Sequence, residues 1–274
     1  ILSLGIDIRK DIILKALYDV ASKYFKIRGI YLRCDVALRE KEGLEEYVGW
    51  YDKIPVTSQE TTTEIVENGL KYLVDFKEGQ KTGFFLDQKY NRLTIRNLAK
   101  DMTVLDCCTH TGSFAMNAAL GGAKKVMALD ISQKALLDAK KNFWLNNLTI
   151  DTYCADLFDY LRKLVDSKNK EYNLIILDPP AFTKSKDTIK SALKGYQEIN
   201  YLAMKALPRG GYLATASCSH YASEEDFIRA IFNASIMAGV SLRVVKKSYA
   251  APDHPEVMGI PETKYLKFFI FQVV

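Results

Sequence analysis

Two residues stand out as candidates for chemistry: Asp178, which opens an Asp-Pro-Pro run, and Cys218, which follows 40 residues later. Carbon 5 of a pyrimidine is a poor nucleophile until a thiolate adds at carbon 6 and makes the ring enamine-like. We therefore expect Cys218 to add to carbon 6 of a pyrimidine. Asp178 is the first candidate for the base that removes the carbon-5 proton, or for the group that protonates ring nitrogen 3, and Glu262 is the second.

The turn at Asp178 is rigid, because its two prolines fix the φ angle and remove backbone donors. The turn alone does not decide the reaction. Related Asp/Asn-Pro-Pro-aromatic turns serve the methylation of exocyclic amines, where carbonyl groups orient the amine and no covalent catalyst is needed. Cys218 favours the pyrimidine mechanism over this alternative.

A structural role is the other interpretation of Cys218, because cysteine often serves as a small buried hydrophobe. We assign that role to Cys34, Cys107, Cys108 and Cys154. The five cysteines form an odd set with neither a CxxC pair nor a histidine cluster nearby. We therefore expect reduced thiols and no metal site.

Strands and helices alternate after about residue 80, which is typical of an α/β doubly wound sheet. We predict strands at 102–107, 125–130, 152–155, 173–178, 212–217, 242–249 and 265–273, the last of them antiparallel. The helices between them begin near residues 112, 132, 156, 188 and 223. In such a sheet the ligand lies across the carboxyl ends of the strands.

Residues 1–79 are expected to form a smaller α+β domain, and 80–274 the sheet domain. Helical spacing of apolar residues over 11–25 is followed by a strand-like run over 30–38. Short extended runs fill 47–76, and Asn68-Gly69 offers the positive φ angles of a hairpin turn. By pattern alone, the segment that follows is a linker.

Acidic residues mark the predicted strand ends. Asp106 opens a turn with the length of a glycine-rich nucleotide loop, but Cys108 and His110 occupy two of the expected glycine positions. A GxGxxG loop for pyrophosphate is therefore absent. The departure favours an adenosine ligand without phosphates, approached closely at Gly112, and S-adenosylmethionine (SAM) is the candidate.

Two further acids extend this site. Asp130 ends the second strand, where a carboxylate commonly accepts hydrogen bonds from ribose hydroxyls. Asp156 follows the third strand and is placed to accept from an adenine amino group. An ordinary helix N-cap is the other interpretation of each acid.

The composition is that of a globular protein, with 48% hydrophobic and 26% charged residues. No apolar run reaches the roughly 18 residues of a membrane span, and no signal peptide is evident, so we expect a cytoplasmic protein with no membrane partner. The net charge of +5 permits a polyanionic partner without requiring one. The chain opens at Ile1 inside an apolar stretch, so we expect upstream sequence to be missing.

These segments resemble the bacterial large-subunit (23S) ribosomal RNA cytosine-5 methyltransferases of the class I SAM-dependent superfamily. The resemblance runs from about Arg33 to the end of the chain. Its specific parts are Lys81–Gln88 with Arg92, Asp106–Phe114, Asp178–Phe182, Ser217-Cys218-Ser219, Asp253-His254-Pro255, Pro261-Glu262 and Tyr265-Leu266-Lys267.

The resemblance implies a Rossmann-like class I methyltransferase fold, with SAM as cofactor and S-adenosylhomocysteine as product. It also implies that the segment around 81–92 contacts the cofactor. The expected cofactor contacts are Phe85, Gln88, Arg92, Asp106, Thr109, Thr111, Gly112, Asp130, Asp156, Leu157 and Asp178. Family members carry an N-terminal PUA-type RNA-binding domain, which these 274 residues lack.

Ribosomal RNA is the expected substrate. A cytosine inside a helix hides carbon 6, so the target should be single-stranded or flipped out. Phe182 and His254 are expected to stack or pair with the extruded base, and Glu262 to lie beside it. Lysines after the Asp178 turn are expected to contact phosphates, with a solvated surface as the alternative: Lys184, Lys186, Lys190 and Lys194.

Other functions stay open at this stage. Relatives that methylate guanine share a similar first turn and an Asp-Pro-Pro-Thr-Phe run but lack the cysteine. A small-molecule or protein methyltransferase would need neither Cys218 nor the lysines, and its activity would be indifferent to salt. A non-catalytic RNA-binding relative would bind RNA without consuming SAM. The presence of Asp106, Asp130, Asp156, Asp178 and Cys218 argues against this alternative. A homodimer is also left open.

Overall fold

The computed structural model describes residues 9–35, 38–183 and 186–274. The chain divides into two compact units, one made of residues up to Ile65 together with Leu73–Phe85, the other of Val66–Tyr72 together with Leu86–Val274. Across the described ranges, no helix is both long and apolar enough to cross a membrane. The apolar run at residues 1–8 lies outside the described residues.

The first unit packs a helix against a two-stranded antiparallel sheet. It contains α1 (Lys10–Ala21), β1 (Tyr31–Cys34), α2 (Leu38–Lys41) and β2 (Tyr47–Trp50). Its buried core consists of Leu14, Ile30, Leu32, Cys34 and Tyr51. The predicted helix and strand are thus present but shorter than their apolar patterns, and α2 begins where the strand was expected to end.

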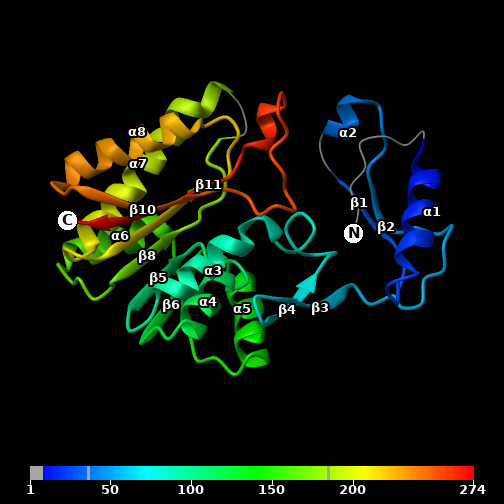
Figure 1. The fold of residues 1–274 in the computed structure, drawn as a ribbon, viewed down its shortest axis with the longest axis horizontal. Helices are drawn as coiled ribbons and strands as arrows, with labels where there is room; N and C mark the ends of the chain where they lie inside the picture. The colour runs from blue at the N-terminus through cyan, green and yellow to red at the C-terminus, as the bar shows by residue number, and fades with distance from the viewer. Residues whose placement is uncertain (1–8, 36–37, 184–185) are drawn as a thin grey trace. The chain divides into compact units, whose positions relative to one another are not determined.

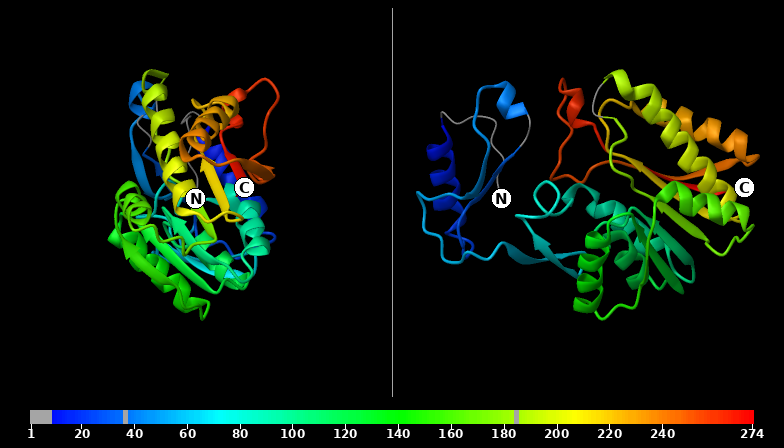
Figure 2. Two further views of the ribbon diagram at one scale, coloured as in Figure 1. Left: turned by 90° about the vertical axis from the view of Figure 1, so that its left-hand side faces the viewer. Right: turned by 180° about the vertical axis from the view of Figure 1, so that it is seen from behind.

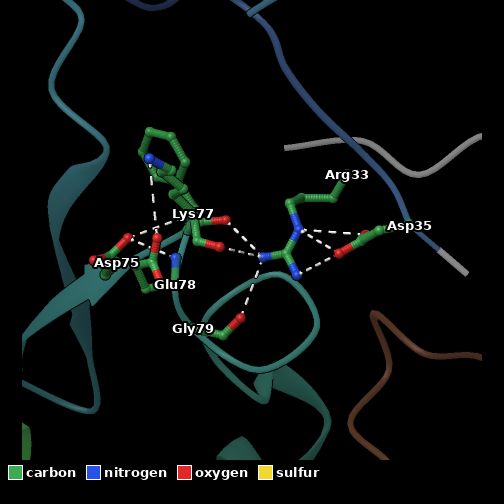
Figure 3. Close-up of polar contacts among 7 residues, drawn as sticks. Arg33, Asp35, Asp75, Lys77, Glu78 and Gly79 are labelled. Carbon is green, nitrogen blue, oxygen red and sulfur yellow. Dashed lines mark hydrogen bonds and ion pairs between the residues drawn. The ribbon is translucent and has the colours of Figure 1, made fainter. Parts of the chain in front are cut away.

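Arg33 on β1 anchors the loop of residues 76–79 through hydrogen bonds to its backbone (Figure 3). Its Nη1 atom lies 2.9, 3.1 and 3.2 Å from the carbonyl oxygens of Phe76, Lys77 and Gly79, to which it donates. Its Nη2 atom donates to a carboxylate oxygen of Asp35 at 2.9 Å. A planar guanidinium can serve several acceptors at once, so Arg33 fixes the backbone of residues 76–79.

A hairpin joins β3 (Thr62–Glu67) to β4 (Leu70–Asp75). Its turn residues Asn68 and Gly69 have φ angles of 53° and 74°. Two positive φ angles are the requirement of a type I′ turn, which matches the twist of the flanking strands. The predicted hairpin is therefore confirmed.

The second unit is built on a seven-stranded sheet in the order β10-β11-β9-β8-β5-β6-β7 (Figure 1). The strands are β5 (Thr103–Cys107), β6 (Lys125–Asp130), β7 (Asp151–Cys154), β8 (Leu174–Leu177), β9 (Tyr212–Ser217), β10 (Leu242–Ser248) and β11 (Lys267–Val273). β11 pairs antiparallel with both β9 and β10, while the β5, β6, β7, β8 and β9 pairs are parallel. The mostly parallel sheet with an antiparallel last strand is confirmed.

Helices cover both faces of this sheet, as its buried apolar strands require. α3 (Lys89–Leu98), α4 (Ser113–Leu120) and α5 (Gln133–Leu145) lie along one face (Figure 1). α6 (Leu157–Asp166), α7 (Ile189–Ala206) and α8 (Glu224–Ala238) supply the other layer, where α7 packs against both α6 and α8 (Figure 2).

The predicted elements of this unit match the observed ones to within one or two residues at most ends. The exception is the segment interpreted as a linker, which contains the 3-10 turn Leu86–Gln88 and then α3. α3 buries the polar side chains of Asn91 and Arg92 together with Ile95. A helix whose buried face is mostly polar gives no apolar periodicity, so the pattern missed it.

Candidate active site at the carboxyl edge of the sheet

Five strands end side by side at the carboxyl edge, in the order β9, β8, β5, β6 and β7. Each carries at or just after its end one residue singled out from the sequence: Cys218, Asp178, Asp106, Asp130 and Asp156. The chain leaves β5 toward β6 and β7 and returns on its other side at β8. Open α/β sheets bind ligands at such a switch point.

The acids converge on the loop after β5. Burial raises the pKa of the Cys108 thiol, and the charges of Asp130, Asp178, Asp106 and Asp156 raise it further. All four carboxylates therefore act electrostatically on one thiol of this loop. An edge with this much negative charge favours a ligand that carries positive charge.

Asp106 is fully buried beneath this edge. Its Oδ2 atom accepts hydrogen bonds from Thr109 Oγ1 at 2.6 Å and from the amide of Ala115 at 2.9 Å. Burial raises the pKa of Asp106 to about 7, and the nearby acids add to the effect. Its buried Oδ1 atom accepts no hydrogen bond from the described residues. Because buried polar atoms are normally paired, Asp106 is suited to accept a donor from a cationic ligand.

The loop between β5 and α4 follows the path of a glycine-rich loop with non-glycine residues. Cys108 and His110 have φ angles of 59° and 50°. Residues other than glycine rarely adopt such angles, and the strain tends to collect at ligand sites. At Gly112, where φ is +83°, a Cβ atom would lie 2.3 Å from Cε1 of Phe143 on α5. Glycine is therefore required there by packing.

Asp130 and Asp156 use their carboxylates differently. Asp130 accepts from the amide of His110 at 2.8 Å through Oδ2 and from that of Ser132 at 2.9 Å through Oδ1, so it joins two loops. Oδ1 of Asp156 accepts from two amides in the first turn of α6 at 2.8 and 3.2 Å. The N-cap interpretation thus holds for Asp156, whereas Ser132 caps α5. Their contacts with ribose and adenine stay predictions.

A polar network holds Asp178. Nε2 of Gln88 donates to Oδ1 of Asp178 at 3.0 Å, and Oε1 of Gln88 accepts from Nδ2 of Asn91 at 2.7 Å. Oδ1 of Asn91 in turn accepts from Ser248 Oγ on β10 at 2.7 Å. Burial raises the pKa of Asp178 to about 7, and the charge of Asp87 adds to it. A carboxyl with this pKa can give or take a proton at neutral pH.

Cys218 is half-buried and directly follows β9. β9 is the parallel neighbour of β8, with Leu177 opposite Thr215, so Cys218 and Asp178 follow adjacent strand ends. The hydroxyl of Ser217 donates to the hydroxyl of Tyr196 at 3.1 Å. A nucleophile candidate and a proton-transfer candidate therefore share one end of the sheet.

Two of the remaining predicted cofactor contacts have other partners in the structure. Arg92 forms a buried pair with Glu67, with Nε–Oε1 and Nη2–Oε2 distances of 2.6 and 2.8 Å. Phe85 belongs to the first unit, where the Lys81 ammonium lies 5.2 Å from its ring centroid. Contact of either side chain with a cofactor stays a prediction.

Thr111 and Leu157 lie at the edges of the site. The carbonyl oxygen of Thr111 accepts from Asn142 Nδ2 on α5 at 3.0 Å, which ties the loop to that helix. Leu157 is the buried first residue of α6 and belongs to the main core. Both therefore help to shape the backbone around the strand ends.

The predicted substrate contacts are spread over three segments. Phe182 packs against Tyr196 with ring centroids 4.7 Å apart, so much of its surface faces the core. His254 is half-buried and lines a small pocket formed by the segment that connects β10 to β11. Glu262 is exposed in the 3-10 turn Pro261–Thr263. Lys184 lies outside the described residues, and so does the side chain of Lys186, while Lys190 and Lys194 are exposed.

The cysteine assignments hold only in part. Cys34 and Cys107 are buried, as expected. Cys108 is half-buried, because it stands in the loop at the sheet edge. Cys154 is exposed, so its assignment as a buried hydrophobe was wrong. It ends β7, one of the two edge strands of the sheet in the described part of the chain.

Three residues near the site were given no individual role from the sequence. The Tyr265 hydroxyl donates to Oδ2 of Asp87 at 2.7 Å, next to the network around Asp178. Lys267 at the start of β11 is almost fully buried near Cys218. A charged residue at the start of a strong apolar strand was the available signal for Lys267; nothing local signals Asp87.

The chain matches the family of S-adenosylmethionine-dependent methyltransferases over residues 43–271. A protein from Streptococcus mutans classed as a SAM-dependent methyltransferase aligns with a TM-score of 0.80 at 22% identity, over 96% of this chain and 65% of that one. A methyltransferase solved with S-adenosylhomocysteine aligns with a TM-score of 0.80 at 23% identity, over 96% of this chain and 66% of that one. The fold is therefore of the Rossmann-like methyltransferase class.

Curated relatives are more similar in sequence. The ribosomal RNA large subunit methyltransferase I of Pseudoalteromonas atlantica is 39% identical over 100% of this chain and 68% of its own length. That of Vibrio vulnificus is 40% identical, also over 100% of this chain and 68% of its own length. This chain belongs to the S-adenosylmethionine-dependent methyltransferase family that includes these proteins, and SAM is its cofactor. It spans about two thirds of their length.

The residues of the edge fit this cofactor. The ammonium and sulfonium groups of SAM are positive, which suits the ring of acids around Cys108. The unpaired Oδ1 atom of Asp106 would accept a hydrogen bond from the ammonium group. The carboxylate of Asp130, at the end of β6, would accept hydrogen bonds from the ribose hydroxyls.

Proposed function

We propose that this protein methylates carbon 5 of a cytosine in large-subunit ribosomal RNA through a covalent adduct with Cys218. The observation that carries the proposal is the placement of Cys218 and Asp178 at adjacent ends of β9 and β8, beside the acidic edge. The names of the relatives at about 40% identity support ribosomal RNA as substrate. An enzyme with this substrate works in the cytoplasm.

The chain's own groups account for the proton and electron movements. The Cys218 thiolate forms a bond to carbon 6, and the displaced ring electrons make carbon 5 nucleophilic. Bound SAM supplies the methyl group that carbon 5 acquires. A base then removes the carbon-5 proton, the ring double bond re-forms and the thiolate leaves. Asp178 is the proposed base or nitrogen-3 proton donor, since its pKa of about 7 serves both roles.

The rigid Asp178 turn supports one alternative. An Asp-Pro-Pro-aromatic turn also suits methylation of a guanine or of another exocyclic or ring nitrogen, in which Cys218 would take no part. A small-molecule or protein methyltransferase is the second alternative. It has less support, because the relatives named above act on ribosomal RNA by name.

Nucleoside analysis separates these functions. The protein is incubated with a large-subunit ribosomal RNA transcript and SAM, and the digested RNA is analysed by mass spectrometry. We expect new 5-methylcytidine from the wild type, none from Cys218→Ala, and unchanged product from Cys154→Ala, which alters an exposed cysteine. A methylated guanine or adenine that survives Cys218→Ala would contradict the proposal.

A further inference from the structure

Lys267 is a buried cation beside the proposed nucleophile. It is the first residue of β11, is 1% exposed, and lies opposite Ser217 in the antiparallel pairing with β9. Cys218 is the next residue after Ser217. Lys267 therefore enters the site from a strand that the proposed mechanism does not use.

The Lys267 ammonium holds the loop that follows Cys218. Its Nζ atom donates to the carbonyl oxygens of Ser219 at 2.5 Å and Ala222 at 2.7 Å. Among the described residues, no carboxylate lies within ion-pair distance of Lys267. Two carbonyl dipoles solvate a buried charge only partly, so the site retains an uncompensated positive charge.

The charge of Lys267 interacts electrostatically with Cys218. Burial lowers the pKa of Lys267 to about 8, and the charges of Cys218 and Glu224 oppose that change. Electrostatic coupling is reciprocal, so a cation held by a neighbouring anion also stabilises that anion. A thiol becomes a better nucleophile at neutral pH when a nearby cation stabilises its thiolate.

Two phenols also interact with Cys218. Tyr196 on α7 and Tyr265 before β11 both interact with it electrostatically. Burial raises the pKa of Tyr196 to about 12 and the pKa of Tyr265 further still, so both phenols are neutral at physiological pH. Asp178 and Glu224 are the acids of this neighbourhood. Among these described groups, Lys267 is the one that carries positive charge.

We propose that Lys267 is a positioning residue that stabilises the thiolate form of Cys218 and fixes the loop of residues 218–222. This inference rests on the proposed nucleophilic role of Cys218. A lysine with a purely structural role would make the same carbonyl contacts without affecting the thiol. The structural role and the thiolate-stabilising role therefore predict different pH dependences of Cys218 reactivity.

Alkylation of Cys218 tests this inference without RNA. The intact protein is treated with iodoacetamide between about pH 6 and about pH 9, and peptide mass spectrometry follows Cys218, with exposed Cys154 as internal reference. We expect Cys218 to reach half its maximal rate at a lower pH than Cys154 in the wild type. Because no substrate is present, the result is independent of whether cytosine is methylated.

Variants isolate the charge. Lys267→Met should move the Cys218 midpoint upward by about one pH unit, which slows alkylation near pH 7 about tenfold. Lys267→Arg should keep most of the wild-type profile, and Lys246→Met, on exposed β10, should keep all of it. A folded Lys267→Met with an unchanged Cys218 midpoint would overturn the proposal. If that variant does not fold, a wild-type Cys218 midpoint at or above that of Cys154 overturns it.

Discussion

Asp106 illustrates at the scale of one residue how a candidate binding site differs from a stable core. Two donors satisfy one of its carboxylate oxygens, while the other is buried without a partner among the described residues. Burial raises the pKa of the group to about 7, so the apo protein holds it near the point of neutralisation. A cationic ligand that paired with Asp106 would relieve this cost, and cofactor binding would then raise the stability of the protein.

The stability of the apo Asp106→Asn variant relative to the wild type should therefore increase as pH rises. The folded pKa of Asp106, about 7, lies above its unfolded value. Its contribution to stability is thus fully present below the unfolded pKa and is lost as pH rises through about 7. Asparagine does not ionise, so the melting temperature of Asp106→Asn relative to wild type should increase from about pH 5 to about pH 8.

Thermal unfolding at several pH values measures this difference, and titration with SAM should show at least a tenfold weaker affinity for Asp106→Asn. Asp159→Asn removes an exposed carboxylate and should change neither quantity appreciably. A melting-temperature difference independent of pH would show that Asp106 titrates at an ordinary value in the folded state.

At the scale of elements, the sequence predicts those that bury an apolar face and misses those that bury a polar one. β6 and β9 begin and end as their apolar runs indicate, and Ser132 caps α5 as expected. α3 carries Asn91 and Arg92 into the interior, where they pair with Ser248 and Glu67. Those partners are remote in sequence, so no local pattern reveals the helix.

Gly112 links the site loop to the packing of α5. Gly112→Ala would add a Cβ atom 2.3 Å from Cε1 of Phe143 at a φ angle of +83°. Gly210 has almost the same φ, +84°, with nothing within 4 Å of its added Cβ atom. Gly210→Ala should cost only the backbone strain, about 1–2 kcal/mol, and retain SAM affinity.

Gly112→Ala should cost more than this and also weaken SAM binding, because the loop must move to relieve the clash. Chemical denaturation and SAM titration of both variants check the comparison. Equal losses of stability with full SAM affinity in Gly112→Ala would mean that the loop does not depend on its close approach to α5.

At the scale of the whole molecule, the sequence predicted which strand ends carry Asp106, Asp130, Asp156, Asp178 and Cys218, because polar residues after apolar strands can be recognised without a structure. It did not reveal the residues that hold the predicted site residues in place. Gln88 reaches Asp178, Tyr265 reaches Asp87, and Lys267 reaches the loop after Cys218 only once the sheet has assembled. The family resemblance drew attention to Gln88 and Lys267, whereas the pattern of the chain gave neither a role.

The charge of the molecule predicts a salt dependence. The chain carries a net charge of +5, and Lys190 and Lys194 are exposed on α7. If two to four phosphates are neutralised on binding, raising salt from about 50 mM to about 200 mM should weaken RNA affinity roughly ten- to a hundredfold. SAM affinity should change little. The double variant Lys190→Ala/Lys194→Ala should flatten the salt dependence, and filter binding at several salt concentrations measures it. A salt-independent reaction would favour a small-molecule substrate.

Trapping the covalent intermediate tests the central claim most directly. In RNA that carries 5-fluorocytosine, no carbon-5 proton can be removed after methylation, so the Cys218 thiolate cannot leave. We predict a SAM-dependent protein–RNA adduct on a denaturing gel, with the cross-linked peptide containing Cys218. Cys218→Ala should form none, and Cys154→Ala should form it normally. An adduct that persists in Cys218→Ala, or 5-methylcytidine formation by that variant, would contradict the account.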